Sequence, residues 1–330
     1  MENLAISTDV FRIYWSSIIT ALAVFCAVVS FLSIYKNEKR YYEKQLFVVL
    51  SIIVSLIFAR LLHWYLKTDA YESLEMAFTK FYEGGYALIG VFFGTALVAL
   101  LFRIFGITKN LRKLLDAAAI SAALGISIGR LAARYLISNR GFVVEEYIPF
   151  LTTIIKDPVS GSEEIRFACF YAQAVACFLI AVYLMIYYSY NNKRQKYTDG
   201  DVFFRFVVLY SASQMLLDST RYDSLYLRSN GFVSLVQICS GSILILLIII
   251  SFIRVLISSW KTVKKGKQFL IFFLGLLSAA FCGFMEYYVQ RHGDQYIFAY
   301  SMMFLALVEI VFVIFSFQNT VQSSKEALIE

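Results

Sequence analysis

The sequence is dominated by long apolar runs that contain no charged residue. A helix crosses the hydrocarbon core of a bilayer with about 20 residues, because each residue adds about 1.5 Å of rise. Uncharged runs of this size are Ile13–Tyr35, Gly84–Phe102, Phe167–Tyr190, Ser229–Ile253 and Gln268–Met285. With 60% apolar and only 16% charged residues, the chain is neither a soluble enzyme nor a disordered protein. The sequence therefore predicts a membrane protein with several spans.

Four further apolar segments have the right length but carry charged residues. They are Gln45–Leu66, Leu114–Ile137, Val202–Ser219 and Gln295–Phe317. Val202–Ser219 has the weakest pattern, because Arg205 shortens its uncharged stretch. Together these runs predict an all-α fold, a polytopic transmembrane helix bundle of about nine helices.

The basic residues of the loops alternate along the chain. Loops 36–45, 103–113, 191–205 and 254–267, with Lys325, hold eighteen Lys and Arg residues, whereas the segments on the other side of the predicted spans hold nine. Because cytoplasmic loops are enriched in Lys and Arg, this alternation predicts an N-terminus outside and a C-terminus in the cytoplasm. Glu2 and Asp9 precede the first run, so we expect a span there and not a cleaved signal peptide.

Loop 139–166 contains both prolines, Pro149 and Pro158, and is the only loop long enough to hold extramembrane structure of its own. The basic stretch Trp260–Lys267 is the best internal boundary, so we expect one domain over 1–257 and two additional spans over 258–330. The net charge of +7 is explained by loop position, and nucleic acid is not expected as a partner.

Cofactors are not expected, because the residues that bind them are scarce. His63 and His292 are too far apart in the sequence to indicate a metal site. All five cysteines fall in apolar runs and are expected to be buried thiols: Cys26, Cys169, Cys177, Cys239 and Cys282.

Charged residues inside spans are costly and tend to mark function. Arg60, Arg130, Arg134 and Asp218 all fall about 22–30 Å above the predicted cytoplasmic end of their spans, near the outer boundary of the hydrocarbon. Other spans bring polar residues to the same level: Tyr14, Tyr86, Ser234 and Gln237. The sequence therefore predicts a polar layer at the outer leaflet.

Two pairs of residues in or near this layer have helical spacing. Arg130 and Arg134 are four residues apart, and Asp218 and Arg221 are three apart, so each pair is expected on one helix face. Three cations with one carboxylate in an apolar wall suit an anionic phosphodiester. The alternative is that each arginine extends separately to the interface. Gly125 and Gly129 indicate that Leu114–Ile137 is a central, closely packed helix.

Five motifs along the chain resemble those of the prolipoprotein diacylglyceryl transferase family and occur in the family's order, over about residues 10–255. They are Ala59-Arg60-Leu61, Glu83-Gly84-Gly85-Tyr86 with Gly90 and Gly94, Asp116-x-x-Ala119 with Leu124-Gly125-x-x-x-Gly129-Arg130, Tyr210…Asp218-x-x-Arg221, and Ser234-x-x-Gln237-x-x-Ser240.

The resemblance implies a seven-span core with the N-terminus outside, in the bacterial cytoplasmic membrane. It implies transfer of a diacylglyceryl group from phosphatidylglycerol to the lipobox cysteine of a prolipoprotein. The residues expected to act in catalysis are Arg130, Arg221 and Asp218. Those expected to bind the lipid substrate are Arg60, Tyr14, Tyr86, Arg134, Tyr210, Gln214 and Gln237.

The chain departs from the family pattern at several positions. Ile89 stands where the family has a histidine, and Gln214 where it has an arginine. Further departures are Ala133, Ser138 and Arg166, whereas Tyr171 is retained. These departures favour an alternative: a catalytically degenerate, phospholipid-binding membrane protein that acts as a scaffold or partner subunit.

Three further points concern readings outside the family pattern. His63 lies one turn from Arg60, where it is either a substitute base or structural. Glu286 and Glu309 lie in the additional spans, and the deeper Glu309 is expected to have a partner. A transporter is disfavoured, because no span has the Gly or Pro interruption of broken helices.

Overall fold

The computed structural model describes residues 4–7, 12–36, 41–71, 73–79, 84–136, 138–156, 162–194, 197–227, 230–258, 265–292 and 295–326. Within these residues, each of the nine predicted spans is an α-helix. The long helices are α1 (Trp15–Ile34), α2 (Tyr41–Leu66), α4 (Leu88–Ile104), α5 (Leu111–Leu131), α6 (Cys169–Lys193), α7 (Asp201–Ser219), α8 (Leu235–Ser258), α9 (Lys265–Arg291) and α10 (Tyr296–Glu326).

Seven of these helices are long and apolar enough to cross a membrane. The other two are α4, a shorter apolar helix of 17 residues, and α7, the segment with the weakest pattern in the sequence. The prediction of an all-α, multi-pass membrane protein is confirmed.

The non-helical segments include three antiparallel hairpins. Their strands are β1 (Leu4–Ser7), β2 (Arg12–Tyr14), β3 (Thr152–Lys156), β4 (Glu163–Phe167), β5 (Tyr226–Leu227) and β6 (Asn230–Ser234). The β3–β4 hairpin pairs Thr152 with Phe167 and Lys156 with Glu163. It lies in loop 139–166, so this loop holds structure of its own; Pro158 lies outside the described residues. The prediction that no other loop could do so is wrong, because the β1–β2 and β5–β6 strand pairs lie outside it.

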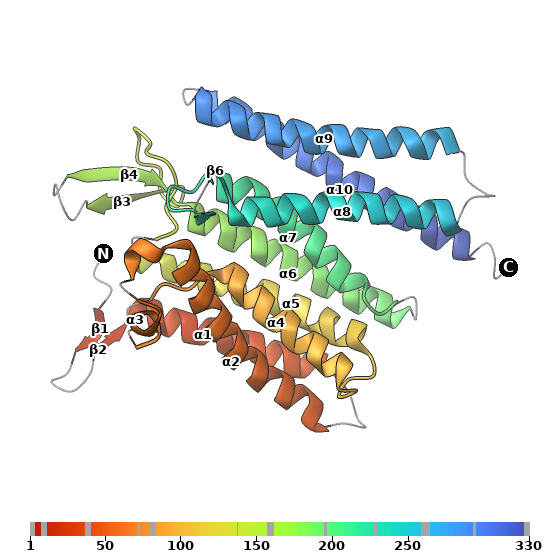
Figure 1. The fold of residues 1–330 in the computed structure, drawn as a ribbon, viewed down its shortest axis with the longest axis horizontal. Coiled ribbons are helices and arrows are strands. Elements are labelled where there is room, and N and C mark those ends of the chain that lie inside the picture. Colours follow the sequence, from red (N-terminus) through yellow and green to blue (C-terminus); the bar gives the residue numbers. More distant parts are fainter. Residues whose placement is uncertain are drawn as a thin grey trace. The chain divides into compact units, whose positions relative to one another are not determined.

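The chain forms two compact units, which are described separately. The first unit comprises residues 1–206 and 221–232, and its helices α1, α2, α4, α5 and α6 run side by side (Figure 1). The β1–β2 and β3–β4 hairpins and the short helix α3 (Leu74–Thr79) lie at one end of this unit, which we call the hairpin end. Here α2 and α5 end and α1, α4 and α6 begin.

Small residues let the helices of the first unit approach closely. A Cβ atom on Gly90 of α4 would lie 2.5 Å from the carbonyl oxygen of Phe58 in α2, and one on Gly94 would lie 2.7 Å from the Cα of Ser55. A Cβ atom on Gly125 of α5 would lie 2.9 Å from the Cβ of Ala27 in α1. In lipid, where apolar side chains gain little by leaving the solvent, such close packing is what holds helices together. With half of its most apolar stretch buried, α5 is the most buried of the seven candidate spans, which confirms its central place.

The second unit comprises residues 207–220 and 233–330. Its helices α8, α9 and α10 pack through a core of Phe252, Val255, Val313 and Phe317. The Ser278 hydroxyl donates a hydrogen bond to Glu309 (2.6 Å), so the expected partner of Glu309 is found. The predicted boundary between residues 257 and 258 stays a prediction, and the described residues omit 259–264, including Trp260.

We expect Gly90→Ala to destabilise the chain by about 1–3 kcal/mol, because the added methyl group forces α2 and α4 apart. The matched control is Gly283→Ala in α9, where a Cβ atom meets nothing within 4 Å. This control is expected to leave stability unchanged or to raise it, since alanine favours helix. Thermal unfolding of both variants in detergent checks the difference; equal melting temperatures would contradict the packing described here.

Candidate functional site

Arg60 lies near the end of α2 and is 2% exposed. Its Nε donates to the carbonyl of Ala77 (2.5 Å), and its Nη1 donates to the carbonyls of Gly84 and Gly85 and to the Tyr71 hydroxyl. Its guanidinium also lies 5.4 Å from the ring centre of Tyr86. These contacts bind the segment between α2 and α4 to the end of α2. Arg60 therefore positions backbone at the hairpin end.

Gly85 is essential to this arrangement. Its φ of +82° lies in the left-handed region that glycine favours, and a Cβ atom there would lie 2.4 Å from the Tyr71 hydroxyl oxygen. The same hydroxyl lies 2.8 Å from Nδ1 of His63. His63 is thus part of the network around Arg60, in agreement with the structural reading of this residue.

Three further arginines lie around Gly141, in the segment that follows α5. Gly141 pairs with Arg221 in a β-bridge, and its N–H donates to the carbonyl of Phe167 (2.8 Å). The N–H of Tyr222 donates to the carbonyl of Arg140 (2.8 Å). Three segments that are distant in sequence therefore meet at the hairpin end: the chain after α5, the strand before α6 and the chain after α7. We call Arg140, Arg166 and Arg221, with Asp223 and Glu164, the Gly141 cluster.

Two arginines of the Gly141 cluster have carboxylate partners. Arg221 donates to Oδ1 of Asp223 through Nε (3.2 Å) and Nη2 (3.1 Å). Arg166 forms an ion pair with Glu164 (2.7 Å), and its guanidinium lies 4.3 Å from the ring centre of Tyr222.

Among the residues that the structure describes, Arg140 has no carboxylate partner, although it is only 5% exposed. Its Nη2 donates to the carbonyls of Arg134 (3.1 Å) and Leu136 (2.7 Å), and its guanidinium lies 4.5 Å from the ring centre of Phe170. Its Nε and Nη1 are buried without a hydrogen-bond partner. Burial lowers the pKa of Arg140 to about 10, although Tyr171 and Asp223 act in the opposite direction. The fold therefore holds a cation whose charge is incompletely compensated, which is costly inside a protein.

Arg130 and Arg134 do not share a helix face as predicted. The α-helix ends at Leu131 and continues as the 3-10 helix η3 (Ala132–Tyr135), which turns by about 120° per residue instead of 100°. Arg130 is half-buried, with its Nε buried and without a hydrogen-bond partner, whereas Arg134 is exposed. The change of helix type thus separates the two side chains.

The predicted helical spacing of Asp218 and Arg221 is also wrong. Asp218 lies in the last turn of α7, but the helix ends at Ser219 and Arg221 lies beyond it. Asp218 is 1% exposed and accepts a hydrogen bond from the Ser234 hydroxyl.

Ser234 and Gln237 form a capping box at the start of α8. The N–H of Gln237 donates to the Ser234 hydroxyl (3.1 Å), and the N–H of Ser234 donates to Oε1 of Gln237 (3.0 Å). The Ser-x-x-Gln motif, which carried part of the family resemblance, therefore begins helix α8. Through the Ser234 hydroxyl it also holds Asp218 at the N-terminus of that helix.

The remaining predicted lipid-binding residues differ in burial. Tyr14 is 41% exposed and Tyr86 is 43% exposed, both at the hairpin end. In the second unit, Tyr210 is half-buried and Gln214 is 1% exposed.

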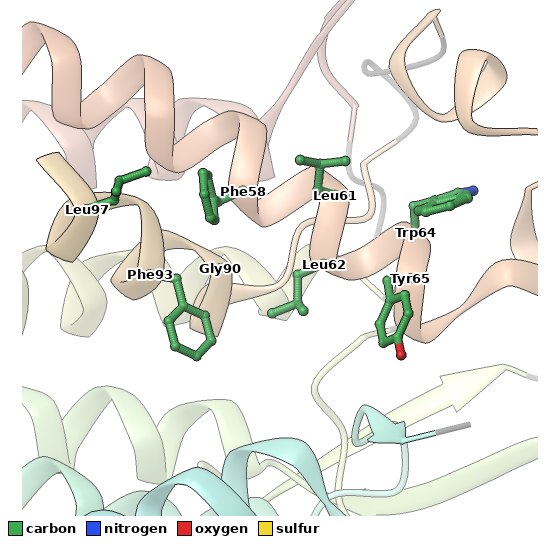
Figure 2. A pocket seen from close by; sticks show the side chains of 8 residues that line it. All are labelled: Phe58, Leu61, Leu62, Trp64, Tyr65, Gly90, Phe93 and Leu97. Carbon is green, nitrogen blue, oxygen red and sulfur yellow. The ribbon is translucent and has the colours of Figure 1, made fainter. Parts of the chain in front are cut away.

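An apolar pocket of about 490 Å³ lies on the α2–α4 pair (Figure 2). Figure 2 shows its side chains on the two facing helices: Phe58, Leu61, Leu62, Trp64, Tyr65, Phe93 and Leu97, beside Gly90. Tyr65 and Phe93 are about half exposed, at 53% and 49%. The side chains that line the groove are aliphatic and aromatic.

Asp116, the first residue of another family motif, holds the start of α7. It accepts hydrogen bonds from the N–H of Gly200 (2.6 Å) and Phe203 (2.7 Å) and from the Tyr197 hydroxyl. A carboxylate at a helix N-terminus satisfies free N–H groups and favours the helix dipole. This motif residue is therefore structural.

Sequence reasoning missed Arg140, Asn139 and Asp223. Asn139 adopts a positive φ of 62° and is 4% exposed; its N–H donates to Oδ2 of Asp223 (2.7 Å). The only sequence signal was the Asn-Arg-Gly run at the start of loop 139–166, since asparagine and glycine favour such turns.

Comparison with known proteins agrees with the motifs. A family model described as prolipoprotein diacylglyceryl transferase matches residues 3–253. The chain is 26% identical over 264 residues to the phosphatidylglycerol–prolipoprotein diacylglyceryl transferase of Oceanobacillus iheyensis, covering 74% of this chain and 88% of the relative. It is 27% identical to the enzyme of the same name from Listeria innocua (68% and 80% covered) and 24% identical to that of Halalkalibacterium halodurans (74% and 85% covered). The chain belongs to the prolipoprotein diacylglyceryl transferase family.

Proposed function

We propose that this chain transfers a diacylglyceryl group from phosphatidylglycerol to the lipobox cysteine of a prolipoprotein. The observation that carries the proposal is the family match over residues 3–253, which includes every arginine of the Gly141 cluster. That cluster places positive charge at the hairpin end, where an anionic lipid head group would lie.

The reaction sets two chemical requirements. The cysteine sulfur, as thiolate, attacks the glyceryl carbon that carries the phosphate; a carbon–sulfur bond forms and the carbon–oxygen bond breaks. The leaving oxygen takes the electron pair, so glycerol phosphate departs with one more negative charge than the diester had. The thiol must lose its proton, and the growing charge on phosphate must be stabilised. Cations fixed in place before the reaction meet the second requirement.

We assign Arg130 and Arg221 to the phosphate. Arg130 brings a buried Nε without a protein acceptor to the end of α5. Arg221 is held beside Gly141 by backbone pairing and by Asp223. Asp223, in place of Asp218, would orient Arg221. Arg60 would act as a positioning residue, because its donors are engaged by the backbone around Gly84 and Gly85.

The apolar groove on α2 and α4 supports the same proposal. It begins one residue from Arg60, at Leu61, and consists of aliphatic and aromatic side chains. A lipid with its head group at the hairpin end would run its acyl chains along such a surface. Of the residues predicted to bind lipid, Tyr14, Tyr86 and Arg134 belong to the first unit and would line this site, whereas the role of Tyr210, Gln214 and Gln237 in the second unit stays a prediction.

We further propose that the hairpin end faces the outside of the bacterial cytoplasmic membrane, with the N-terminus outside and the C-terminus in the cytoplasm. The basic loops at the opposite end support this orientation. Residues 1–257 would carry the transferase, because the family match ends at residue 253. The two helices α9 and α10 would be an addition packed on α8.

The departures at Ile89 and Gln214 favour a second candidate: a lipid-binding protein of the same fold that acts as scaffold or partner subunit without transfer. The two candidates share the anionic phospholipid as ligand. They differ in whether a prolipoprotein is modified.

Complementation separates the two candidates. In cells depleted of their own transferase, we expect the intact chain to restore lipidation of a reporter lipoprotein, measured by its shift in gel mobility. Arg130→Ala is expected to reduce lipidation at least 100-fold, because removing one group that stabilises transition-state charge costs about that much. Arg194→Ala is the matched control, since Arg194 is exposed and stacks on Tyr190 at the end of α6 opposite the hairpins. Normal membrane insertion without any lipidation by the intact chain would favour the scaffold.

Cysteine labelling tests the orientation. A membrane-impermeant maleimide is expected to label Glu146→Cys, in the loop after α5, in intact cells. It should label Lys109→Cys, in the loop between α4 and α5, only after permeabilisation. Both residues are exposed, and the unmodified chain gives the background from its own five cysteines. The reverse pattern would contradict the proposed orientation.

A further inference from the structure

Arg140 is fixed in position by backbone contacts that engage only one of its three guanidinium nitrogens. Two carbonyls, those of Arg134 and Leu136, accept from Nη2 alone. The Arg140 carbonyl accepts from the N–H of Tyr222, so the residue is also tied to the chain after α7. The N–H groups of Nε and Nη1 remain without a protein acceptor in a side chain that is 5% exposed.

The carboxylates of the cluster are engaged elsewhere. Asp223 accepts from Arg221 at Oδ1 and from the Asn139 N–H at Oδ2. Glu164 pairs with Arg166. The Gly141 cluster thus has three guanidinium groups and two carboxylates, and Arg140 is the member for which the structure records no hydrogen bond or ion pair to a carboxylate.

A buried guanidinium with free donors is matched to an anion that brings several acceptor oxygens. Phosphate oxygens accept charge-assisted hydrogen bonds from arginine, and the guanidinium stays charged over the whole physiological pH range. A neutral ligand would leave the charge uncompensated. A carboxylate brings fewer oxygens than the three N–H groups of Nε and Nη1.

We propose that Arg140 is a further anion-binding residue, which takes a phosphate group through its Nε and Nη1. The inference rests on the proposed function, because the phosphate would be that of phosphatidylglycerol or of the glycerol phosphate that leaves. The backbone of Arg140 lies beside that of Arg221 through the pairing of Gly141, so both residues bring positive charge to the same part of the hairpin end.

The test measures binding and stability and does not depend on turnover. The purified full chain is placed in phosphatidylcholine nanodiscs, and its melting temperature is followed in two arms. One arm replaces part of the lipid with phosphatidylglycerol; the other adds glycerol 1-phosphate in solution. The wild-type melting temperature is expected to rise with the phosphate-bearing ligand, and the two arms show whether lipid or free phosphate ester is the source.

Three variants define the outcome. Arg140→Gln is expected to weaken the apparent affinity at least 10-fold, and Arg140→Lys to give an intermediate loss. Arg140→Met, in phosphatidylcholine alone, is expected to melt close to the wild-type temperature, because removal of an uncompensated charge offsets the loss of the two hydrogen bonds to the carbonyls of Arg134 and Leu136. The matched control Arg194→Gln should bind as the wild type does.

The proposal is overturned if Arg140→Gln binds as tightly as the wild type, or if wild-type melting responds to neither ligand. It is also overturned if Arg140→Met and Arg140→Lys both melt well below the wild type, since Arg140 would then serve the carbonyls of Arg134 and Leu136 only. If the chain binds the phosphate-bearing ligand in a way that depends on Arg140 but transfers no diacylglyceryl group, the proposed function is rejected and this inference is retained.

Discussion

The structure depends on how a membrane protein satisfies backbone polar groups where its helices end. Within the bilayer the helices pair these groups internally, but at the hairpin end the chain leaves helical geometry and its carbonyls need donors. Arginine supplies them: Arg60 donates to the carbonyls of Ala77, Gly84 and Gly85, and Arg140 donates to those of Arg134 and Leu136. The same residues that hold the loops therefore concentrate positive charge at one end of the first unit. Arg140 thus holds loop structure through its hydrogen bonds and, on our proposal, also binds an anion.

The helices were predictable from the sequence because length and apolarity decide them. Every predicted span is a helix, and even Val202–Ser219 agrees with α7 (Asp201–Ser219) almost residue for residue. The helix face on which each charged residue lies was not predictable, because it depends on where the helix ends. Two extra residues of α-helix would have placed Arg221 on the face of Asp218, and a change to 3-10 geometry after Leu131 moved Arg134 outward. Arg140 was missed for a related reason: a loop arginine is ordinarily solvated, and only the meeting of three distant segments at Gly141 buries it.

The motifs that resemble the family separate into two physical classes. Asp116 holds the start of α7, Ser234 and Gln237 begin α8, and Gly90 brings α4 against α2. These residues stabilise the fold. Their presence therefore indicates the fold of the family and does not by itself indicate its catalytic activity. Arg130 and Arg221 belong to the other class, because they bring charge to the hairpin end. The scaffold residues explain why family membership is evident at about 25% identity, whereas activity depends on the charged class.

The two main departures from the family differ in chemical consequence. Ile89 removes a group that could accept the thiol proton, but a cysteine at neutral pH is already a few per cent thiolate. Without a base, the rate would fall by roughly 30-fold from this cause for a thiol that keeps its ordinary pKa, since thiolate still forms by equilibrium. Loss of a cation at the leaving phosphate costs about 100- to 1000-fold, because no solvent equilibrium replaces a charge fixed in an apolar site. On the proposed function, the arginine lost at Gln214 would therefore matter more than the histidine lost at Ile89, and Arg130, Arg140 and Arg221 would supply positive charge of the kind that a leaving phosphate needs.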